Sequence, residues 1–485
     1  MLIISTRNNK SLLAAHSIVA NKLFYYEEND HAIIRRMEAL ATEAAKHAEA
    51  TGENGRLECY VVFDHSTSLW LLQTIGIGPE IERWLDVLAT TKEDLMAKSV
   101  FLKLPKLTSP FPPLDRVPIS KDSQTRAHLV LVGNSALTEA MALNAALVAH
   151  YPNYCKDTRL RTRITIIDEE IWQLKDQLTQ RYVHLFEHSY YRTIDLSDEH
   201  PQCLLHRPLY EQKRKDFVDV EWEFVKGTVR SEAVRQKLTE WSTDNQQVLT
   251  IILCHDQQDR NCNEAFSLPQ AINEASIPVL CYTDESDLLR LASQEASYRS
   301  VYAFGTDTCN IDLLTTLRSM AQRVNYVYNH CFSLTPSDPI TAPSTIHTEQ
   351  LEKLWQRVGS ITKQYSNIFN AMTMATKMHS LGHTSDDWQT YYALTAEEID
   401  ILTEVEHNRW NVEELILGYR PTNDEEQKLV EEDITQKKIL RKRKIHYDIR
   451  AYDDLRTDVT GKNVNVYDQA LTQGIPLIIK SCITD

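Results

Sequence analysis

HLVLVGNSALTEAMALNAALVAH, residues 128–150, joins a continuous apolar run to a helix-forming segment through one glycine, Gly133. The same rhythm continues along the chain, where the apolar runs RITIID, VLTIILC, IPVLCYT and VYAFG alternate with segments of helical periodicity. Runs that are apolar throughout, rather than at alternate positions, are typical of a parallel sheet covered by helices on both faces. We therefore expect a doubly wound parallel sheet of about six strands, one of them a short strand at 192–196.

The sequence predicts four regions in order along the chain. Residues 1–120 mix helix and strand signals and form an N-terminal α/β region, and a proline-rich run separates it from the sheet region, 121–312. The periodicity then becomes wholly helical, so we expect a helical connector at 313–394. Thr395-Ala-Glu-Glu398 is a capping box, and it opens a last, helical domain at 395–485. The predicted fold class is therefore α/β plus all-α.

Composition excludes several classes of protein. The 485 residues include 52 Lys and Arg against 68 Asp and Glu, and the net charge of −16 repels phosphate backbones, so we expect no nucleic-acid partner. No apolar run approaches the roughly 20 residues of a membrane helix, so we expect no membrane insertion. The chain has no signal-peptide pattern at its start, and its nine cysteines are scattered without a C-x-x-C pair. We therefore expect a cytoplasmic protein with reduced thiols.

The turn after the first apolar run is where a dinucleotide-binding sheet contacts a pyrophosphate. On the pattern G-x-G-x-x-G, Gly133 takes the first position, whereas Ser135 and Thr138 replace the other two glycines and offer hydroxyls to a phosphate. The second strand ends at Asp168, the position from which an acid hydrogen-bonds a ribose. Two interpretations stay open, a sheet that binds NAD or another adenine nucleotide and a sheet that binds no cofactor.

Three segments of this region, LVLVGNSALTEAMALNAA, ITIIDEE and LTIILCHDQQDRNCNEAFSL, resemble the TrkA-N branch of Rossmann domains, the ligand-sensing regulators of potassium transport. In that family a carboxylate and an asparagine commonly follow the fourth strand, and Asp256, Asp259 and Asn261 stand there in this chain. The resemblance implies nucleotide sensing without turnover. With the turn, it gives five candidate cofactor-binding residues: Gly133, Ser135, Thr138, Asp168 and Asp256.

The sharpest pattern of the C-terminal region is LTEVEHNRWNVEELILGYRP, residues 402–421, followed by KIHYDIRAYDDL, residues 444–455. Together they resemble the RyR domain, the small helical repeat of ryanodine receptors that bacterial proteins carry as a single copy. KQYSNIFNAMTMATKMHSLG, residues 363–382, resembles the helical segment that joins Rossmann and RyR domains in such proteins. Tyr447 and Asp448 depart from the family's proline and cysteine. The matching residues are Glu404, His407, Trp410, Gly418, Tyr419, His446, Tyr452 and Leu455.

The RyR resemblance implies an adenine-nucleotide ligand. Tandem repeats of ryanodine receptors hold such a nucleotide with the motif tryptophans stacked on the base, which assigns the stacking role to Trp410. The basic cluster KKILRKRK, residues 437–444, offers cations to the phosphates. Two simpler interpretations stay open, Trp410 as a core residue and the basic cluster as a solvated face. The candidate ligand-binding residues of this domain are Glu404, His407, Trp410, Tyr419, Arg441 and Arg443.

No catalytic pattern stands out in the sequence. A nucleophile elbow, a Walker A motif and metal-ligand spacing are all absent, and Asp64-His65 has no specificity by itself. We therefore expect a non-catalytic regulatory protein that senses a nucleotide-type ligand through its Rossmann or RyR domain, or both. A single RyR copy needs a second wall for its ligand from another domain or subunit, which points to a homo-oligomer or a protein partner. An NAD(P)-dependent or nucleotide-modifying enzyme and a protein-docking scaffold remain the alternatives.

Overall fold

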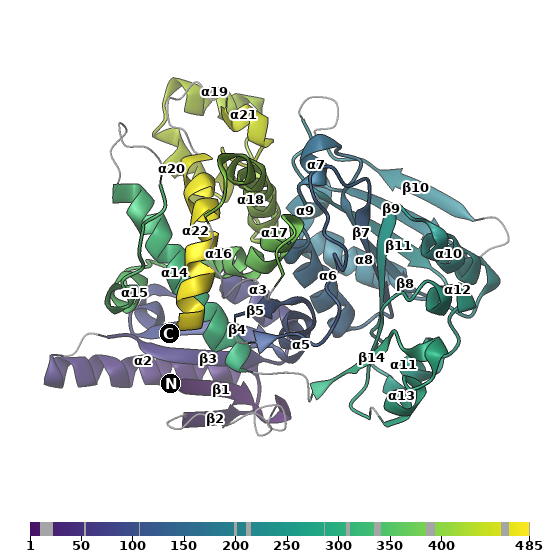
Figure 1. The fold of residues 1–485 in the computed structure, drawn as a ribbon. Helices are drawn as coiled ribbons and strands as arrows, with labels where there is room; N and C mark the ends of the chain where they lie inside the picture. Colours follow the sequence, from purple (N-terminus) through teal and green to yellow (C-terminus); the bar gives the residue numbers. More distant parts are fainter. Residues whose placement is uncertain are drawn as a thin grey trace.

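The protein combines two parallel sheets with a group of helices, as Figure 1 shows for a computed structural model. The α/β plus helical class expected from the sequence is confirmed. The structure describes residues 1–9, 23–52, 55–105, 107–197, 201–209, 215–285, 287–306, 311–333, 341–384, 393–456 and 465–484.

The N-terminal region contains a four-stranded parallel sheet in the order β2-β1-β3-β4. Its strands are β1 (Leu2–Thr6), β2 (Leu23–Glu27), β3 (Leu57–Phe63) and β4 (Leu85–Thr91). Its helices are α2 (Asp30–Thr51), α3 (Ser66–Ile75), α4 (Pro79–Glu82) and α5 (Lys92–Phe101). The chain passes from β1 to β2 on one side and then returns to β3 on the other side. The strand order therefore reverses between β1 and β3, and ligands commonly bind beyond the carboxyl ends of strands at such a point.

The second sheet has eight strands in the order β10-β9-β11-β8-β7-β12-β13-β14, and every neighbouring pair is parallel except β10 with β9. Here the strand order reverses between β7 and β12. The strands are β7 (Arg126–Val132), β8 (Thr162–Asp168), β9 (Tyr190–Asp195), β10 (Gln202–His206), β11 (Val220–Lys226), β12 (Gln247–Leu253), β13 (Val279–Tyr282) and β14 (Val301–Phe304).

Helices cover both faces of this sheet, which explains why its central strands are apolar throughout. On β7, Leu129 and Leu131 belong to one apolar core, and Val130 and Val132 belong to another on the opposite face. The first face carries α6 (Ala136–Val148), α8 (Ile171–Arg181) and α9 (Val183–His188). The second face carries α10 (Glu232–Thr243), α11 (Gln258–Ala265), α12 (Gln270–Glu274) and α13 (Asp287–Ala292).

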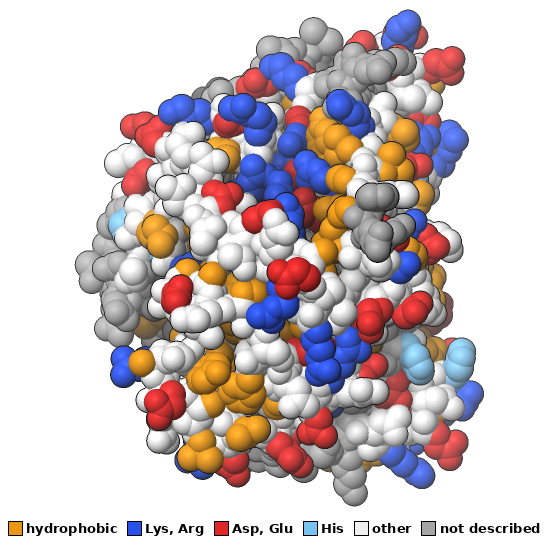
Figure 2. Space-filling view, turned by 90° about the vertical axis from the view of Figure 1, so that its right-hand side faces the viewer, with side chains coloured by type: hydrophobic (Ala, Val, Ile, Leu, Met, Phe, Trp, Pro, Cys, Tyr) orange, Lys and Arg blue, Asp and Glu red, His pale blue; other side chains and the backbone are white. Residues whose placement is uncertain are grey.

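The expectation of about six strands was wrong, because β10 and β11 were missed. β9 corresponds to the short strand expected at 192–196, but β11 lies between it and β8. In β11, Glu221 and Glu223 interrupt the apolar run that Trp222 and Phe224 would otherwise continue. Both carboxylates are buried and pair with three arginines of the neighbouring strands: Arg126, Arg163 and Arg192. On the side of the molecule that carries this sheet, Figure 2 shows basic, acidic and hydrophobic side chains mixed over the surface.

The chain after this sheet is helical, apart from the two-residue strands β15 (Arg420–Pro421) and β16 (Ile445–His446), which pair with each other. At the start of α18 the predicted capping box is present, with Thr395 and Glu398 each bonded to the other's backbone. The helices are α14 (Asp312–Ser333), α15 (Thr348–Trp355), α16 (Ile361–Met372), α17 (Met374–Ser380), α18 (Ala396–Ile416), α19 (Asp424–Glu432), α20 (Gln436–Lys442), α21 (Tyr452–Arg456) and α22 (Asn465–Thr484).

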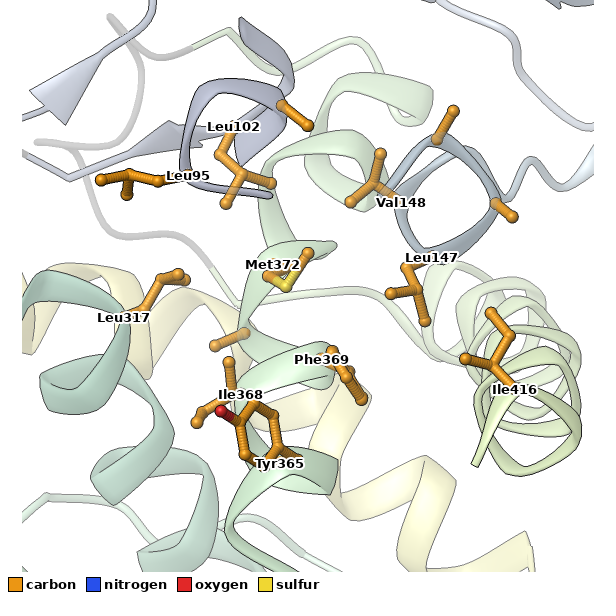
Figure 3. Packing of buried hydrophobic residues seen from close by; sticks show 14 of the residues in the cluster. Leu95, Leu102, Leu147, Val148, Leu317, Tyr365, Ile368, Phe369, Met372 and Ile416 are labelled. Atoms are coloured by element: carbon orange, nitrogen blue, oxygen red, sulfur yellow. The ribbon is translucent and has the colours of Figure 1, made fainter. Parts of the chain in front are cut away.

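Helix α16 lies at the centre of the molecule and connects its parts. Its side chains Tyr365, Ile368, Phe369 and Met372 pack among residues of α5, α6, α14 and α18, as Figure 3 shows. The Tyr365 hydroxyl also donates to the carbonyl of Ala89 in β4 at 2.8 Å and accepts from its N–H at 2.9 Å. α16 therefore covers the edge of the small sheet while it packs against the helices of both other regions.

Candidate functional site

The C-terminal candidate site begins where α18 ends. Gly418 has φ +80°, a left-handed conformation that an L side chain adopts only with strain. This turn lets the N–H of Tyr419 donate to the carbonyl of Glu414 at 2.9 Å, and the N–H of Gly418 donate to that of Leu415. The glycine that the sequence pattern contains therefore folds Tyr419 back against the last turn of α18. Trp410 and Glu414, four residues apart, share one face of that helix.

Three rings meet on this face. The Trp410 indole is half-buried, and the His446 ring of β16 lies edge-on to it with 4.9 Å between ring centroids. Tyr419 lies on another side of the same imidazole, at 6.0 Å. Burial lowers the pKa of His446 to about 3, and the Asp448 N–H donates to its Nδ1 atom. The imidazole is therefore neutral at physiological pH, and it holds the two larger rings in place.

A buried carboxyl group lies beside these rings. Glu414 is 4% exposed, and its Oε2 atom has no hydrogen-bond partner in the described part of the chain. Burial, and then the neighbouring Glu413, raise the pKa of Glu414 to about 8. Burial lowers the pKa of Arg441. The neighbouring Glu414 and Tyr419 outweigh this effect, so that the pKa of the guanidinium group is raised. At neutral pH the site therefore presents a protonated carboxyl group close to a guanidinium group.

Lys444 completes the site from the turn between α20 and β16. Its φ of +59° is uncommon for a residue with a side chain. Its ammonium group lies 4.2 Å from the centroid of the Tyr419 ring and donates to the carbonyl oxygens of Leu417 at 3.3 Å and Thr74 at 2.7 Å. Burial lowers the pKa of this ammonium group. Sequence reasoning missed Glu414 and the role of His446, and it nominated Lys444 only as part of the basic cluster 437–444, because the contacts of these residues come from separate segments.

The His407 ring packs against the Trp410 indole with 5.6 Å between ring centroids, whereas the remaining nominated residues of this region lie elsewhere. His407 is buried, and both of its ring nitrogens are used, Nδ1 with the Asp468 carboxylate at 3.1 Å and Nε2 with the carbonyl of Arg450 at 2.9 Å. Glu404 lies near Cys155 of α7 (Asn153–Lys156). Burial, and then this carboxylate, raise the pKa of the Cys155 thiol. Arg443 is exposed at the end of α20. The structure thus brings together His407, Trp410, Tyr419 and Arg441, but not Glu404 or Arg443.

A fully buried ion-pair network holds α18 against α17. The Glu406 carboxylate accepts from Lys377 of α17 and from Arg409, which also donates to Glu413. Asn370 of α16 adds a hydrogen bond of 2.8 Å to Glu406. Burial raises the pKa of Glu406, but Arg409 and Lys377 outweigh it and hold that pKa at about 2. These buried charges are paired with one another across α17 and α18, so they fix the position of the helix that carries Trp410.

The glycine turn of the large sheet is packed against its own protein. Gly133 has φ +123°, and a Cβ atom placed there would lie 2.8 Å from the backbone nitrogen of His255. Ser135 caps α6 and donates from its hydroxyl to the carbonyl of Cys254 at 2.5 Å, and Thr138 donates to the carbonyl of Gly133 at 3.0 Å. Gly133 therefore lets the turn pack closely against the end of β12. The hydroxyl groups of Ser135 and Thr138 both donate to backbone carbonyl groups of the protein.

His255 lies at the centre of this carboxyl edge. Its Nε2 atom is 2.9 Å from the Glu264 carboxylate, and its Nδ1 atom is 3.8 Å from that of Asp168. Gly133, Ser135, Thr138 and Asp168 are thus brought together as expected, whereas Asp256 is exposed at the next position of the chain. Sequence reasoning missed His255, although it directly follows the apolar run VLTIILC and so stands at a strand end.

No family model, no curated protein and no solved structure matches the chain. Among the residues that the structure describes, no three His, Cys, Asp or Glu side chains are grouped so that they could hold a metal ion. In the same described ranges, no helix has both the length and the apolar character that crossing a bilayer requires.

Proposed function

We propose that this chain is a regulatory protein that senses a nucleotide-type ligand, and that the ligand binds at the Trp410 cluster. We define this cluster as Trp410, Glu414, Tyr419, Arg441 and Lys444. The observation that carries the proposal is the partly exposed indole beside a buried carboxyl group whose Oε2 atom has no partner in the described residues. A buried polar group of this kind costs free energy unless a ligand or water satisfies it.

Three members of the Trp410 cluster have a chemical counterpart in a nucleotide. An indole that stacks on a base contributes about 1–3 kcal/mol. A protonated Glu414 donates one hydrogen bond and accepts another, which suits the edge of a purine that carries both a donor and an acceptor. The guanidinium group of Arg441 suits a phosphate, which it can bind through two parallel hydrogen bonds.

The large sheet gives this proposal independent support. Six of its seven parallel strands, in the order β11-β8-β7-β12-β13-β14, correspond to the Rossmann order 3-2-1-4-5-6, and β9 lies outside them next to β11. We propose that this region is a Rossmann domain of the TrkA-N type, followed by an RyR domain from Thr395 onward. The turn at Gly133 uses its hydroxyls internally, and His255 fills the space next to it. We therefore assign the principal nucleotide site to the Trp410 cluster and not to the glycine turn.

A route from this cluster to the rest of the protein runs through α3. Lys444 bonds to Thr74 near the end of α3, and at the start of that helix Ser66 accepts a hydrogen bond of 2.8 Å from Arg181 of α8. Arg181 also pairs with Glu139 in the first turn of α6. A ligand that displaces Lys444 would therefore act on the helix that joins the two sheets. We propose this contact as the coupling element of the sensor.

Native mass spectrometry of the full chain with ATP, cyclic AMP and NAD tests the proposal. We expect at least one of these nucleotides to be retained by the wild-type protein and lost from Trp410→Ala. Retention of NAD alone, with the same occupancy in Trp410→Ala, would instead favour a dinucleotide at the large sheet and the alternative of an NAD(P)-dependent enzyme. No retained nucleotide under any condition would overturn the proposal in favour of a protein-docking scaffold.

A further inference from the structure

The small N-terminal sheet has a polar carboxyl edge that the proposed nucleotide site does not use. The strand order reverses between β1 and β3. Thr6 is the last residue of β1 and Asn8 and Asn9 follow it, while Asp64 and His65 follow the end of β3. Ligands of open parallel sheets commonly bind at this place, because the loops after two neighbouring strands diverge there. The carboxyl edge of the small sheet is therefore, like that of the larger sheet, a position at which a ligand is expected to bind.

Asp64 is held firmly but is not saturated. Its Oδ1 atom accepts from the Thr6 hydroxyl and from Asn9 Nδ2 at 3.0 Å, and its Oδ2 atom accepts from Asn8 Nδ2 at 2.8 Å. A carboxylate offers about four lone-pair sites, so with the partners that the described residues supply about one remains on Oδ2. Glu93, in the first turn of α5, lies close enough that Asp64 raises its pKa in addition to the larger effect of burial. The edge thus carries a fixed hydrogen-bond acceptor with spare capacity.

Asp30 differs from Asp64, because its capacity is used to position His65. The Asp30 carboxylate accepts from the backbone N–H groups of Asp64 and His65, from the Ser68 hydroxyl and from Nδ1 of His65 at 3.1 Å. Three of these contacts are to Oδ2 and one is to Oδ1. The arrangement favours the tautomer with its proton on Nδ1 and leaves Nε2 as an acceptor. Asp30 is buried, whereas the His65 side chain is 74% exposed.

Stability alone does not account for this pair. An ion pair or hydrogen bond with one partner so exposed contributes about 0–1 kcal/mol, and α3 begins at His65 without any side-chain cap from that residue. The imidazole is instead held in one orientation by a buried carboxylate and directed into solvent at the edge where the strand order reverses. Such an oriented, exposed acceptor is typical of ligand sites.

We propose that this edge is a second ligand site, which binds the vicinal hydroxyl groups of a sugar or the ribose of a nucleoside through Asp64, Asn8 and His65. The Oδ2 atom of Asp64 and the Oδ1 atom of Asn8 accept hydrogen bonds, and so does the Nε2 atom of the imidazole tautomer that carries its proton on Nδ1. A matching ligand must donate, and a pair of adjacent hydroxyls supplies two donors at short spacing. Asp30 is a positioning residue, since it acts on the ligand only through His65.

Histidine-selective carbon-13 NMR of the full chain tests this site, with methyl β-D-ribofuranoside as the probe. The probe has a fixed cis-diol and no base to stack on Trp410, so its binding is independent of the nucleotide proposal. His65→Gln assigns the His65 signal, and His31→Gln, which removes another exposed histidine, is the control. We expect a saturable shift of the His65 signal, and binding of the 2-deoxy analogue at least about tenfold weaker because one donor is lost.

Two further variants separate ligand binding from a structural role. Asn8→Ala changes an exposed side chain. It should weaken the binding of the probe while leaving the thermal unfolding midpoint unchanged. Asp30→Asn should alter the nitrogen-15 signals that report the His65 tautomer, and it should also weaken the binding of the probe. An unshifted His65 signal up to the solubility of the probe would overturn the proposal, and so would equal binding of the 2-deoxy analogue. Loss of probe binding in Trp410→Ala would instead place the ribose at the Trp410 cluster.

Discussion

The ammonium group of Lys444 donates a hydrogen bond of 2.7 Å to the backbone carbonyl of Thr74, across 370 residues of sequence. Thr74 lies in the last turn of α3, and His65 immediately precedes the first turn of the same helix. The two candidate ligand sites are therefore connected by one helix of ten residues. This contact is one direct connection between the C-terminal helices and the helix that begins at the carboxyl edge of the small sheet.

The first prediction concerns this contact. Lys444→Met keeps the aliphatic stem but removes the charged donor, and it should lower the free energy of unfolding by about 1–2 kcal/mol, because two carbonyl groups lose a charged partner. Hydrogen exchange by mass spectrometry should show faster exchange in the last turn of α3. Lys442→Met, on the exposed side of α20, is the control and should change neither quantity. An unchanged rate of hydrogen exchange in α3 of Lys444→Met would contradict the proposed coupling.

The second prediction concerns pH and Glu414. Its folded-state pKa of about 8 lies above the value of about 4.3 for an unfolded chain, so between these pH values the folded protein binds the extra proton. Wild-type stability should therefore fall as pH rises through this window. Glu414→Gln cannot ionise, so it should match the wild type near pH 4 and exceed it near pH 8 by on the order of 4 kcal/mol.

Urea titrations of both proteins across this pH range measure the difference for Glu414→Gln. Glu432→Gln replaces an exposed glutamate of α19 and should show no pH-dependent difference from the wild type. A difference between Glu414→Gln and the wild type that stays constant with pH would mean that Glu414 is ionised in the folded protein. The acceptor-and-donor role that we give this carboxyl group would then be wrong.

The third prediction concerns the glycine turn. Gly133→Ala combines a φ of +123° with a Cβ atom 2.8 Å from the backbone of His255, and backbone cannot move aside cheaply. We expect a loss of about 2–4 kcal/mol in the free energy of unfolding. Gly359→Ala adds the same methyl group where no heavy atom lies within 4 Å, and it should be neutral within about 0.5 kcal/mol. Equal stabilities of the two variants would contradict the packing of this turn.

The fourth prediction concerns the central helix α16. Phe369→Ala removes a ring that is 2% exposed and lies among the side chains shown in Figure 3, so it should cost about 3–5 kcal/mol. Leu429→Ala on α19 truncates a side chain that is 49% exposed and should cost less than about 1 kcal/mol. Thermal unfolding followed by circular dichroism compares the two. Similar midpoints would show that α16 does not connect the parts of the molecule as described.

Local signals in the sequence predicted the elements that depend on neighbouring residues. The capping box at Thr395 needs only contacts between residues three apart, and the strand at 57–63 and the helix after Gly133 follow directly from periodicity. β11 was missed for a physical reason. Its buried glutamates are stable only because arginines of three other strands lie beside them, and no local window of sequence contains those arginines.

The candidate sites were predicted only in part, because residues distant in the sequence complete them. The pattern around Trp410 identified the helix and the ring, but Arg441 and Lys444, which complete the cluster, come from α20 and the turn after it. At the glycine turn, Ser135 was expected to face a phosphate, and its hydroxyl is instead bonded to Cys254, 119 residues away. Which way a hydroxyl group points is decided by tertiary neighbours, and sequence patterns do not contain them.

The most direct test of the nucleotide site compares Trp410→Ala with Trp84→Ala by native mass spectrometry of the full chain in ATP, cyclic AMP and NAD. Trp84 is a half-buried indole of the N-terminal region, and so its variant controls for the loss of a large side chain. Both variants should keep the far-ultraviolet circular dichroism of the wild type. We predict that a nucleotide retained by the wild type and by Trp84→Ala is lost from Trp410→Ala. Equal retention by all three proteins would contradict the assignment of the ligand to the Trp410 cluster.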